Sequence, residues 1–288
     1  GNLLSGFLQM LQDGENIKLE DVNNNLSIST KRNSTLIKSF PADEFPIIPK
    51  IEKEESFEID SDKFIEGIKS VAYSASQSGI KAEISSVYIY TEGDELVFAS
   101  TDSYRLAEKK IDIKKGVSFS GAIIPIKNAM EIVRIFENIH NQVEVLFTKN
   151  QMSLISEGIY FTSRVVGGVF PDYRQIIPKE KKTEVVVLKK DLMDAIKLSN
   201  VFSDKTNQIN VKVLPSEKLF EISSRNQDKG ESVNKIDSVI EGEDVDINLN
   251  ARYILDCLNN TPEDSISISF NSNTRPVVIR GVGDRTFT

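Results

Sequence analysis

The chain has 288 residues, of which 39% are hydrophobic and 27% charged, and it carries a net charge of −8 at pH 7. These values are typical of a folded globular protein with two or three domains. They disfavour a protein that binds nucleic acid over an open basic surface, unless its positive charge is confined to one inner face.

The first fifty residues predict one helix followed by three strands. Apolar residues at helical spacing indicate a helix over 3–11, and alternation of apolar and polar residues indicates strands over 17–21, 26–30 and 35–40. A proline-rich segment that ends at Pro49 closes this part of the chain.

Residues 51–180 follow, and their second half contains the same order of elements as residues 1–50. A strand over 56–59 leads into a helix over 62–76, and further strands follow. A second helix over 128–139 then precedes strands over 142–148, 152–156 and 160–166 and a proline-rich exit at Pro178. Pro49 and Pro178 are 129 positions apart, which indicates an internal repeat.

A third copy follows. It has a strand over 184–188, a helix over 190–202, a second helix over 251–259, and strands over 265–270 and 277–280. We therefore predict an α+β protein built from repeated domains, each with two helices and antiparallel sheets. Residues 1–50 are the second half of one repeat, 51–180 are a complete repeat, and 181–288 are a third that lacks its last strand.

The predicted helices carry basic residues on the face opposite their apolar stripe. Lys63 and Lys69 lie on one helix, Lys127 and Arg134 on the next, and Arg252 on the last. Such faces are often no more than solvated surface. If all the helices line one surface, however, the same residues form a positive lining that attracts phosphates without reading sequence.

Nothing in the sequence predicts catalysis, a metal or a cofactor. His140 stands alone in a turn, and Cys257, the only cysteine, lies on an apolar helix stripe and should be a buried core residue. A lone cysteine excludes an internal disulfide and fits a reducing cytoplasm. Asp102 and Asp172 each precede an arginine closely, so an ion pair or turn cap explains them better than paired catalytic carboxylates. No apolar run reaches membrane-spanning length, so no membrane partner is expected.

Three segments together resemble one protein family. The segment 101–107, Thr-Asp-Ser-Tyr-Arg-Leu-Ala, resembles the Thr-Asp-x-x-Arg-Leu-Ala motif of the bacterial DNA polymerase III beta subunits, the sliding clamps. The segment 170–174, Phe-Pro-Asp-Tyr-Arg, with Ile177-Pro178, resembles a second hallmark of that family, and 252–258 is similar to its third-domain helix.

The resemblance implies an architecture and an activity. Two chains would form a head-to-tail homodimer ring of clamp domains, with helices lining the hole and sheets outside. Double-stranded DNA would pass through the hole, held topologically and independently of sequence. The ring would tether the replicative DNA polymerase and so confer processivity, without chemistry of its own. The polymerase and the clamp loader would bind through extended peptide motifs.

The resemblance also assigns site residues. It places the partner-peptide pocket at Ile84, Thr101, Ser103, Tyr104, Arg105, Leu106, Pro171, Gln175, Ile176 and Pro276. Together with the charged helix faces, it implies a DNA-facing set made of Lys63, Lys69, Lys81, Lys127, Arg134, Lys189, Lys190, Lys197 and Arg252.

The chain departs from the family pattern in three places. It begins in the middle of clamp domain 1, and it stops before the last strand and the C-terminal tail of domain 3. Ala82 and Glu83 stand where the family carries aromatic residues beside the DNA. In a complete ring, the edge strand 35–40 would face the Leu198 region of the partner. An alternative interpretation is a β-rich repeat protein that scaffolds other proteins and binds no DNA.

Overall fold

The computed structural model describes residues 1–11, 14, 16–45, 55–272 and 274–288. The chain divides into two compact units, Gly1–Lys50 and Ile51–Thr288, which are treated separately below. Pro49 and most of the predicted boundary at 50–55 lie outside the described residues.

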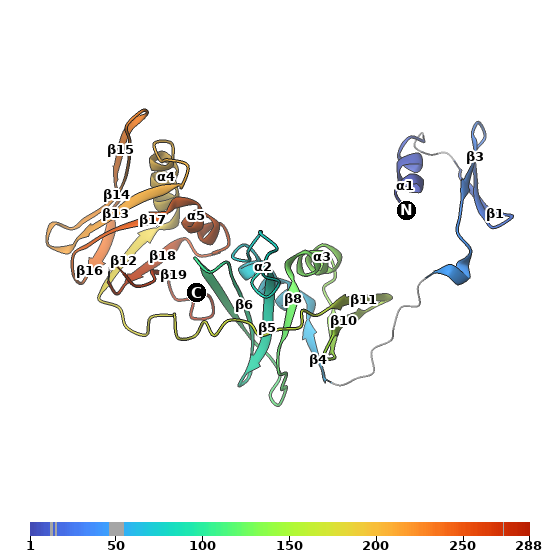
Figure 1. Cartoon of the computed structure of the whole chain (residues 1–288), viewed down its shortest axis with the longest axis horizontal. Helices are drawn as coiled ribbons and strands as arrows, with labels where there is room; N and C mark the ends of the chain where they lie inside the picture. Colours follow the sequence, from blue (N-terminus) through green and yellow to red (C-terminus); the bar gives the residue numbers. More distant parts are fainter. Residues whose placement is uncertain (12–13, 15, 46–54, 273) are drawn as a thin grey trace. The chain divides into compact units, whose positions relative to one another are not determined.

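The first unit contains one helix and one small sheet, drawn in blue in Figure 1. Helix α1 (Asn2–Gln9) precedes the antiparallel strands β1 (Lys18–Val22), β2 (Asn25–Ser29) and β3 (Ser34–Lys38), in the order β1-β2-β3. Asn23 and Asn24 join the first two strands with positive φ angles of 53° and 57°, as a two-residue hairpin turn requires. A 3-10 turn, η1 (Ala42–Glu44), follows the sheet.

The second unit opens with the middle repeat, which runs from β4 to β11. Its helices are α2 (Ser61–Ala72) and α3 (Ile126–Phe136). Its two antiparallel sheets have the strand orders β11-β10-β9-β4 and β7-β6-β5-β8. The strands are β4 (Glu55–Asp60), β5 (Ser86–Glu92), β6 (Glu95–Thr101), β7 (Leu106–Asp112), β8 (Ala122–Pro125), β9 (Gln142–Phe147), β10 (Gln151–Ser156) and β11 (Ile159–Arg164).

The last repeat, from β12 to β19, has the same plan. Its helices are α4 (Lys189–Asn200) and α5 (Ala251–Asn259), and its sheets have the orders β15-β14-β13-β17 and β16-β12-β18-β19. The remaining elements are β12 (Thr183–Leu188), β13 (Gln208–Leu214), η2 (Pro215–Glu217), β14 (Leu219–Asn226), β15 (Gly230–Lys235), β16 (Ser238–Glu241), β17 (Val245–Asn250), β18 (Ser265–Phe270) and β19 (Val278–Gly281). The order β7-β6-β5-β8 thus recurs as β15-β14-β13-β17, which confirms the repeated α+β architecture.

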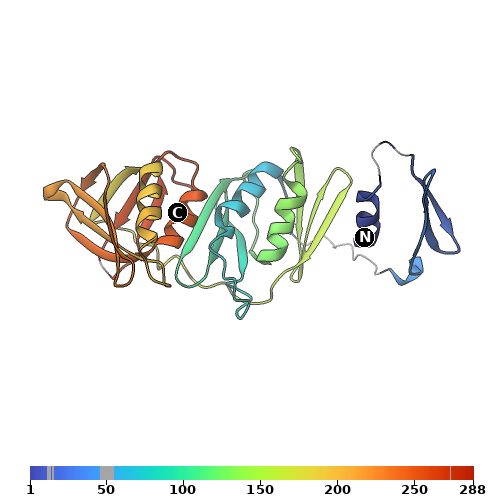
Figure 2. The same cartoon turned by 90° about the horizontal axis from the view of Figure 1, so that it is seen from above.

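Each repeat buries its own apolar core between helices and sheets. In the middle repeat, Phe64 of α2 meets Phe98 of β6 edge-on, with ring centroids 5.5 Å apart. In the last repeat, Ile196, Phe220 and Leu258 are fully enclosed. Helices α2 and α3 contact each other, as do α4 and α5. Figures 1 and 2 show the four helices in a row on one side of this unit.

The two repeats are joined by main-chain hydrogen bonds as well as by side chains. The N–H of Glu108 donates to the carbonyl of Thr288 at 2.8 Å, and the N–H of Lys110 donates to that of Thr286 at 2.7 Å. Phe287 lies between them and is buried in the core of the middle repeat, together with Cys257 of α5. The end of the last repeat therefore extends the sheet of the middle repeat beyond β7.

The helix and strand boundaries differ from the predictions by a few residues, for physical reasons. Helix α2 ends at Ala72 and not at residue 76, because the N–H of Ser76 turns away to donate to the carbonyl of Ile84. Strand β11 ends at Arg164 and not at 166, because the N–H of Val166 donates to Ile123 of the other sheet. In the described part of the chain, none of the helices has the length and apolarity to cross a membrane.

Candidate functional site

The turn between β6 and β7 is fixed by its own side chains. Asp102 Oδ1 accepts the N–H groups of Tyr104 and Arg105 at 2.9 and 3.0 Å. The Thr101 hydroxyl donates to the carbonyl of Arg105 at 2.6 Å and accepts the N–H of Ser103 at 3.1 Å. Ser103 has a φ of +78°, a left-handed conformation that these bonds hold in place. Asp102 also pairs with Arg105 at 3.1 Å, which confirms the predicted turn cap and ion pair.

Leu106 follows this turn and joins it to the second hallmark segment. Its side chain packs, with Ile177, against a buried cluster that includes Phe170 and Tyr173. Phe170 also stacks on Tyr88, with ring centroids 5.0 Å apart. The segments 101–106 and 170–177 therefore meet on the face of the sheet that contains β5–β8.

The exposed part of the second segment lies beside this apolar cluster. Pro171, Gln175 and Ile176 are exposed, and Ile176 presents 57% of its surface. Of the two local contacts predicted for Asp172, an ion pair or a turn cap, the structure shows no ion pair with Arg174, and Gln175 donates to Asp172 at 2.6 Å. Arg174 turns instead to Glu92, at 3.2 Å, because Tyr90 offers it an aromatic ring on that side.

The other predicted pocket residues differ in their exposure. Tyr104 is 85% exposed and Ser103 is exposed, whereas Ile84 is buried. Pro276 is exposed and belongs to the last repeat, just before β19. The predicted pocket residues of the middle repeat thus include the buried Ile84 and Thr101 and the exposed Ser103 and Tyr104.

A buried hydroxyl network beneath the second segment was not predicted from the sequence. The Tyr173 hydroxyl donates to Glu108 at 2.6 Å and contacts the Tyr90 hydroxyl at 2.8 Å. Burial raises the pKa of Tyr173 far above its ordinary value, and the neighbouring Glu108 carboxylate raises it further. The phenol therefore remains a donor, and it ties the segment to β7. Glu108 lies 65 positions away in the sequence, so no local pattern signals this contact.

Eight of the nine residues predicted to face DNA are exposed. Lys189 is the exception, because it is half-buried and donates to the carbonyl of Thr261 at 2.8 Å. Lys69 pairs with Glu137 at 2.5 Å, and Arg134 with Glu131 at 2.7 Å. Within the described ranges, the other six form no ion pair: Lys63, Lys81, Lys127, Lys190, Lys197 and Arg252.

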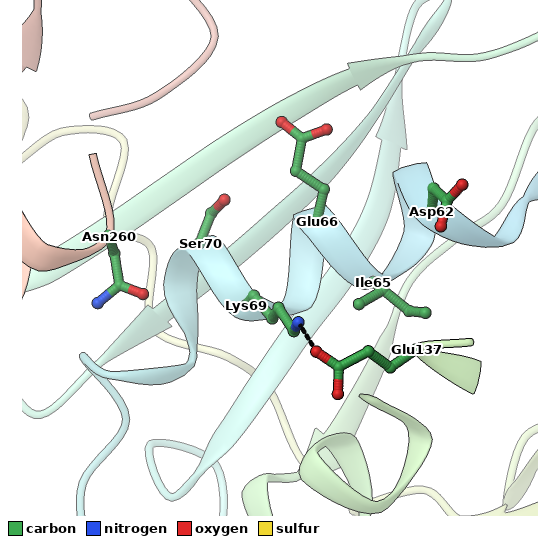
Figure 3. A pocket seen from close by; sticks show the side chains of 7 residues that line it. All are labelled: Asp62, Ile65, Glu66, Lys69, Ser70, Glu137 and Asn260. Carbon is green, nitrogen blue, oxygen red and sulfur yellow. Dashed lines mark hydrogen bonds and ion pairs between the residues drawn. The ribbon is translucent and has the colours of Figure 1, made fainter. Parts of the chain in front are cut away.

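A cavity of about 290 Å³ opens on the helix side, between α2, the end of α3 and the end of α5 (Figure 3). Its lining includes the carboxylates of Asp62, Glu66 and Glu137 but only one cation, Lys69. Figure 3 shows Lys69 directed at Glu137 and Asn260 approaching from the last repeat. Lys109 of β7 also pairs with Glu66 at 3.0 Å, so this part of the surface carries a small excess of carboxylates.

The cysteine, the histidine and the acidic residues are the side chains from which a metal site could be built. Among the residues with assigned positions, no three His, Cys, Asp or Glu side chains are placed to hold a metal ion. His140 is exposed and contacts Asp62 at 3.0 Å, in agreement with the prediction of a solvated turn residue. Cys257 is buried as predicted, and burial raises the pKa of its thiol, which contacts Tyr73.

Comparison with known proteins gives one consistent answer. Residues 58–172 match the DNA polymerase III beta subunit central domain, and residues 174–288 match the C-terminal domain of the same subunit. The beta sliding clamp of Bacillus subtilis is 31% identical over 250 residues, which cover 85% of this chain and 66% of that protein. The chain thus spans about two thirds of the length of that relative.

Solved structures agree with this result. A sliding clamp from Bacillus subtilis matches with a TM-score of 0.92 and 27% identity, covering 99% of this chain and 76% of that one. A clamp from Pseudomonas aeruginosa bound to griselimycin matches with a TM-score of 0.94 and 19% identity, covering 99% and 78%. The chain belongs to the DNA polymerase III beta subunit family, the beta sliding clamps.

Proposed function

We propose that the protein is a DNA sliding clamp that encircles duplex DNA and tethers the replicative polymerase to it. The observation that carries this proposal is the tandem clamp fold, in which the helices of the middle and last repeats lie on one side of the unit. Residues 1–50 would belong to the first clamp domain, 51–180 to the second and 181–288 to the third. The protein would work in the cytoplasm and act by topology, without catalysis.

A homodimer ring is supported by the contact between the middle and last repeats. There, the edge strand β7 pairs with residues 286–288. Strand β15 has the same position in its own sheet, and it lies at the edge of that sheet. Exposed apolar side chains lie on β15 and on the nearby end of α4, namely Leu198, Val201 and Val233. We infer that a second copy adds a strand at this edge and covers these side chains.

A loose grip on DNA is supported by the charge of the helix side. Six exposed cations are available to phosphates, but carboxylates neutralise Lys69 and Arg134. Such a surface holds the duplex weakly and without sequence preference. A closed ring needs no more, because topology and not affinity keeps it on the template.

Partners would bind as extended peptides beside Leu106. The floor made by Leu106, Phe170 and Ile177 is apolar, and Ile176 adds an exposed apolar wall. An extended segment with an apolar anchor fits such a surface, and the buried area would supply most of the affinity. The polymerase and the clamp loader would share this pocket.

Loading onto circular and linear DNA tests the ring. We expect the whole protein, loaded by its clamp loader onto a nicked circular plasmid, to co-elute with the DNA in gel filtration. Cutting the plasmid once should release the protein from the DNA, because a ring slides off free ends. Equal retention on both forms would contradict the proposal and favour a surface binder. Absence from both would favour the scaffold alternative.

Leu106→Asp tests the pocket. Griselimycin, which the Pseudomonas aeruginosa clamp binds, serves as the probe. We expect the wild-type protein to bind it and Leu106→Asp to lose binding, because a carboxylate on the apolar floor is costly to bury. The measurement is isothermal titration calorimetry, and Val239→Asp on the exposed face of β16 is the matched control. Undiminished binding to Leu106→Asp would place the pocket elsewhere.

A further inference from the structure

Arg105 lies at the contact between the middle and last repeats. Its Nε donates to Asp102 at 3.1 Å and its Nη1 donates to Asp256 of α5 at 2.6 Å. The guanidinium also lies over the rings of Tyr73, at 5.5 Å, and Tyr253, at 4.5 Å. Tyr73 and Asp102 belong to the middle repeat, whereas Tyr253 and Asp256 belong to the last. Arg105 therefore holds residues of both repeats at once.

These contacts leave little of Arg105 for a bound partner. Only 17% of its side chain is exposed, whereas the neighbouring Tyr104 is 85% exposed. Two carboxylates each accept one of its N–H donors and two rings flank its planar group, an arrangement that suits arginine and would not suit lysine. A peptide that engaged the whole guanidinium would have to displace Asp256 or one of the tyrosines.

We propose that Arg105 is a positioning residue and not a peptide contact. It connects the turn between β6 and β7 to helix α5, and Asp256 affects the proposed pocket through this connection. This inference rests on the function proposed above. It separates Arg105 from its neighbours Tyr104 and Leu106, which remain available to a partner.

The route from Asp256 to the pocket passes through Asp102. Asp102 Oδ2 accepts the Arg105 side chain, while Oδ1 accepts the main-chain N–H groups of Tyr104 and Arg105. The Asp102 carboxylate thus holds both the conformation of the turn and the position of the Arg105 side chain. Leu106 follows directly, so a shift of α5 changes where this apolar side chain lies.

The last repeat contains the same kind of turn, between β14 and β15, but without an ion pair to another repeat among the residues that the structure describes. Asn226 Oδ1 accepts the N–H groups of Asp228 and Lys229 at 2.9 and 3.2 Å, as Asp102 does in the middle repeat. Lys229 occupies the place of Arg105, but it donates to the carbonyls of Val201 and Ser203 in its own repeat. The turn therefore folds without a carboxylate from another repeat, and a variant of Asp256 should fold as well.

The test compares Asp256→Asn, Arg105→Met and the double variant in the whole protein. We expect each single variant to weaken griselimycin binding about tenfold, a coupling typical of linked sites, and the double variant to weaken it no further. Hydrogen exchange at the amides of Tyr104 and Arg105 should accelerate in Asp256→Asn even without ligand. Asp237→Asn, which changes an exposed carboxylate between β15 and β16, should change neither quantity.

The outcomes distinguish a failure of this inference from a failure of the proposed pocket. Asp256→Glu should restore most of the affinity, because it returns the charge that Arg105 needs. Wild-type affinity in Asp256→Asn together with weak binding in Arg105→Met would mean that Arg105 touches the ligand, and this would overturn the inference. If griselimycin binds Leu106→Asp as it binds the wild type, the proposed pocket is wrong, and the inference about Arg105 is wrong as well.

Discussion

Gly67 shows how closely helix α2 approaches the sheet beneath it. A Cβ built on this residue would lie 2.3 Å from the ring of Phe98, well inside van der Waals contact. Phe98 is fully buried and packs edge-on against Phe64, so its ring has no room to move away. Glycine is required here by close packing and not by backbone conformation.

We therefore expect Gly67→Ala to destabilise the protein. Overpacking of a tight core typically costs about 1–3 kcal/mol, which exceeds the helix propensity that alanine gains. Urea denaturation followed by circular dichroism measures the difference in unfolding free energy. Gly167→Ala is the matched control, since no atom lies within 4 Å of its added Cβ. Equal stability of the two variants would show that the core around Phe98 is loose.

Single residues also show which features of the site can be predicted from the sequence and which cannot. The turn around Asp102 is predictable because its partners lie within three residues. The role of Arg105 is not predictable, because Asp256 lies 151 positions away and no local pattern connects them. The same holds for Lys189: helical spacing places it on a charged face, yet the carbonyl of Thr261, 72 positions away, takes its ammonium group.

Among the elements, the short terminal segment 286–288 has the largest effect on how the repeats join. It forms three main-chain hydrogen bonds with β7, and Lys109 of that strand reaches Glu66 at 3.0 Å and the Thr286 hydroxyl at 3.0 Å. Phe287 enters the core of the middle repeat at 1% exposure. The joint is thus a strand addition stabilised by one buried aromatic ring.

Phe287→Ala should loosen this joint and leave each repeat folded. Removal of a buried phenylalanine typically costs about 3–5 kcal/mol, and here the loss falls on the contact between two separate cores. Differential scanning calorimetry should show the transition of the second unit splitting into two, whereas Phe287→Leu, which retains most of the apolar volume, should keep one. An unsplit transition at the wild-type temperature would contradict this account.

Element types were predictable from periodicity, whereas element ends were not. The apolar stripe of α2 continues to Ala75, which is indeed buried, although the helix stops at Ala72. Burial alone cannot distinguish a last helical turn from a packed loop. The decisive contact, between Ser76 and Ile84, depends on a loop whose path the sequence does not specify.

For the whole molecule, the repeat was the feature that the sequence predicted best. Matching spacings of helices and strands are a property of the chain itself, and the recurring sheet orders confirm them. The pairing of charges on the helix side is not predictable from helical spacing, because the partner of Lys69 is Glu137, 68 positions away. Asp62, Glu66 and Glu137 give one part of that side a small excess of negative charge, although Lys69 and Lys109 pair with two of them.

The buried position of Cys257 has a practical consequence. The sequence holds no other cysteine, and the thiol of this one is enclosed between the repeats with a raised pKa. A maleimide dye added to the native protein would therefore find almost no thiolate to attack. A cysteine introduced at exposed Ser78 would become the sole reactive handle, so fluorophores for single-molecule tracking can be attached without first removing the native one.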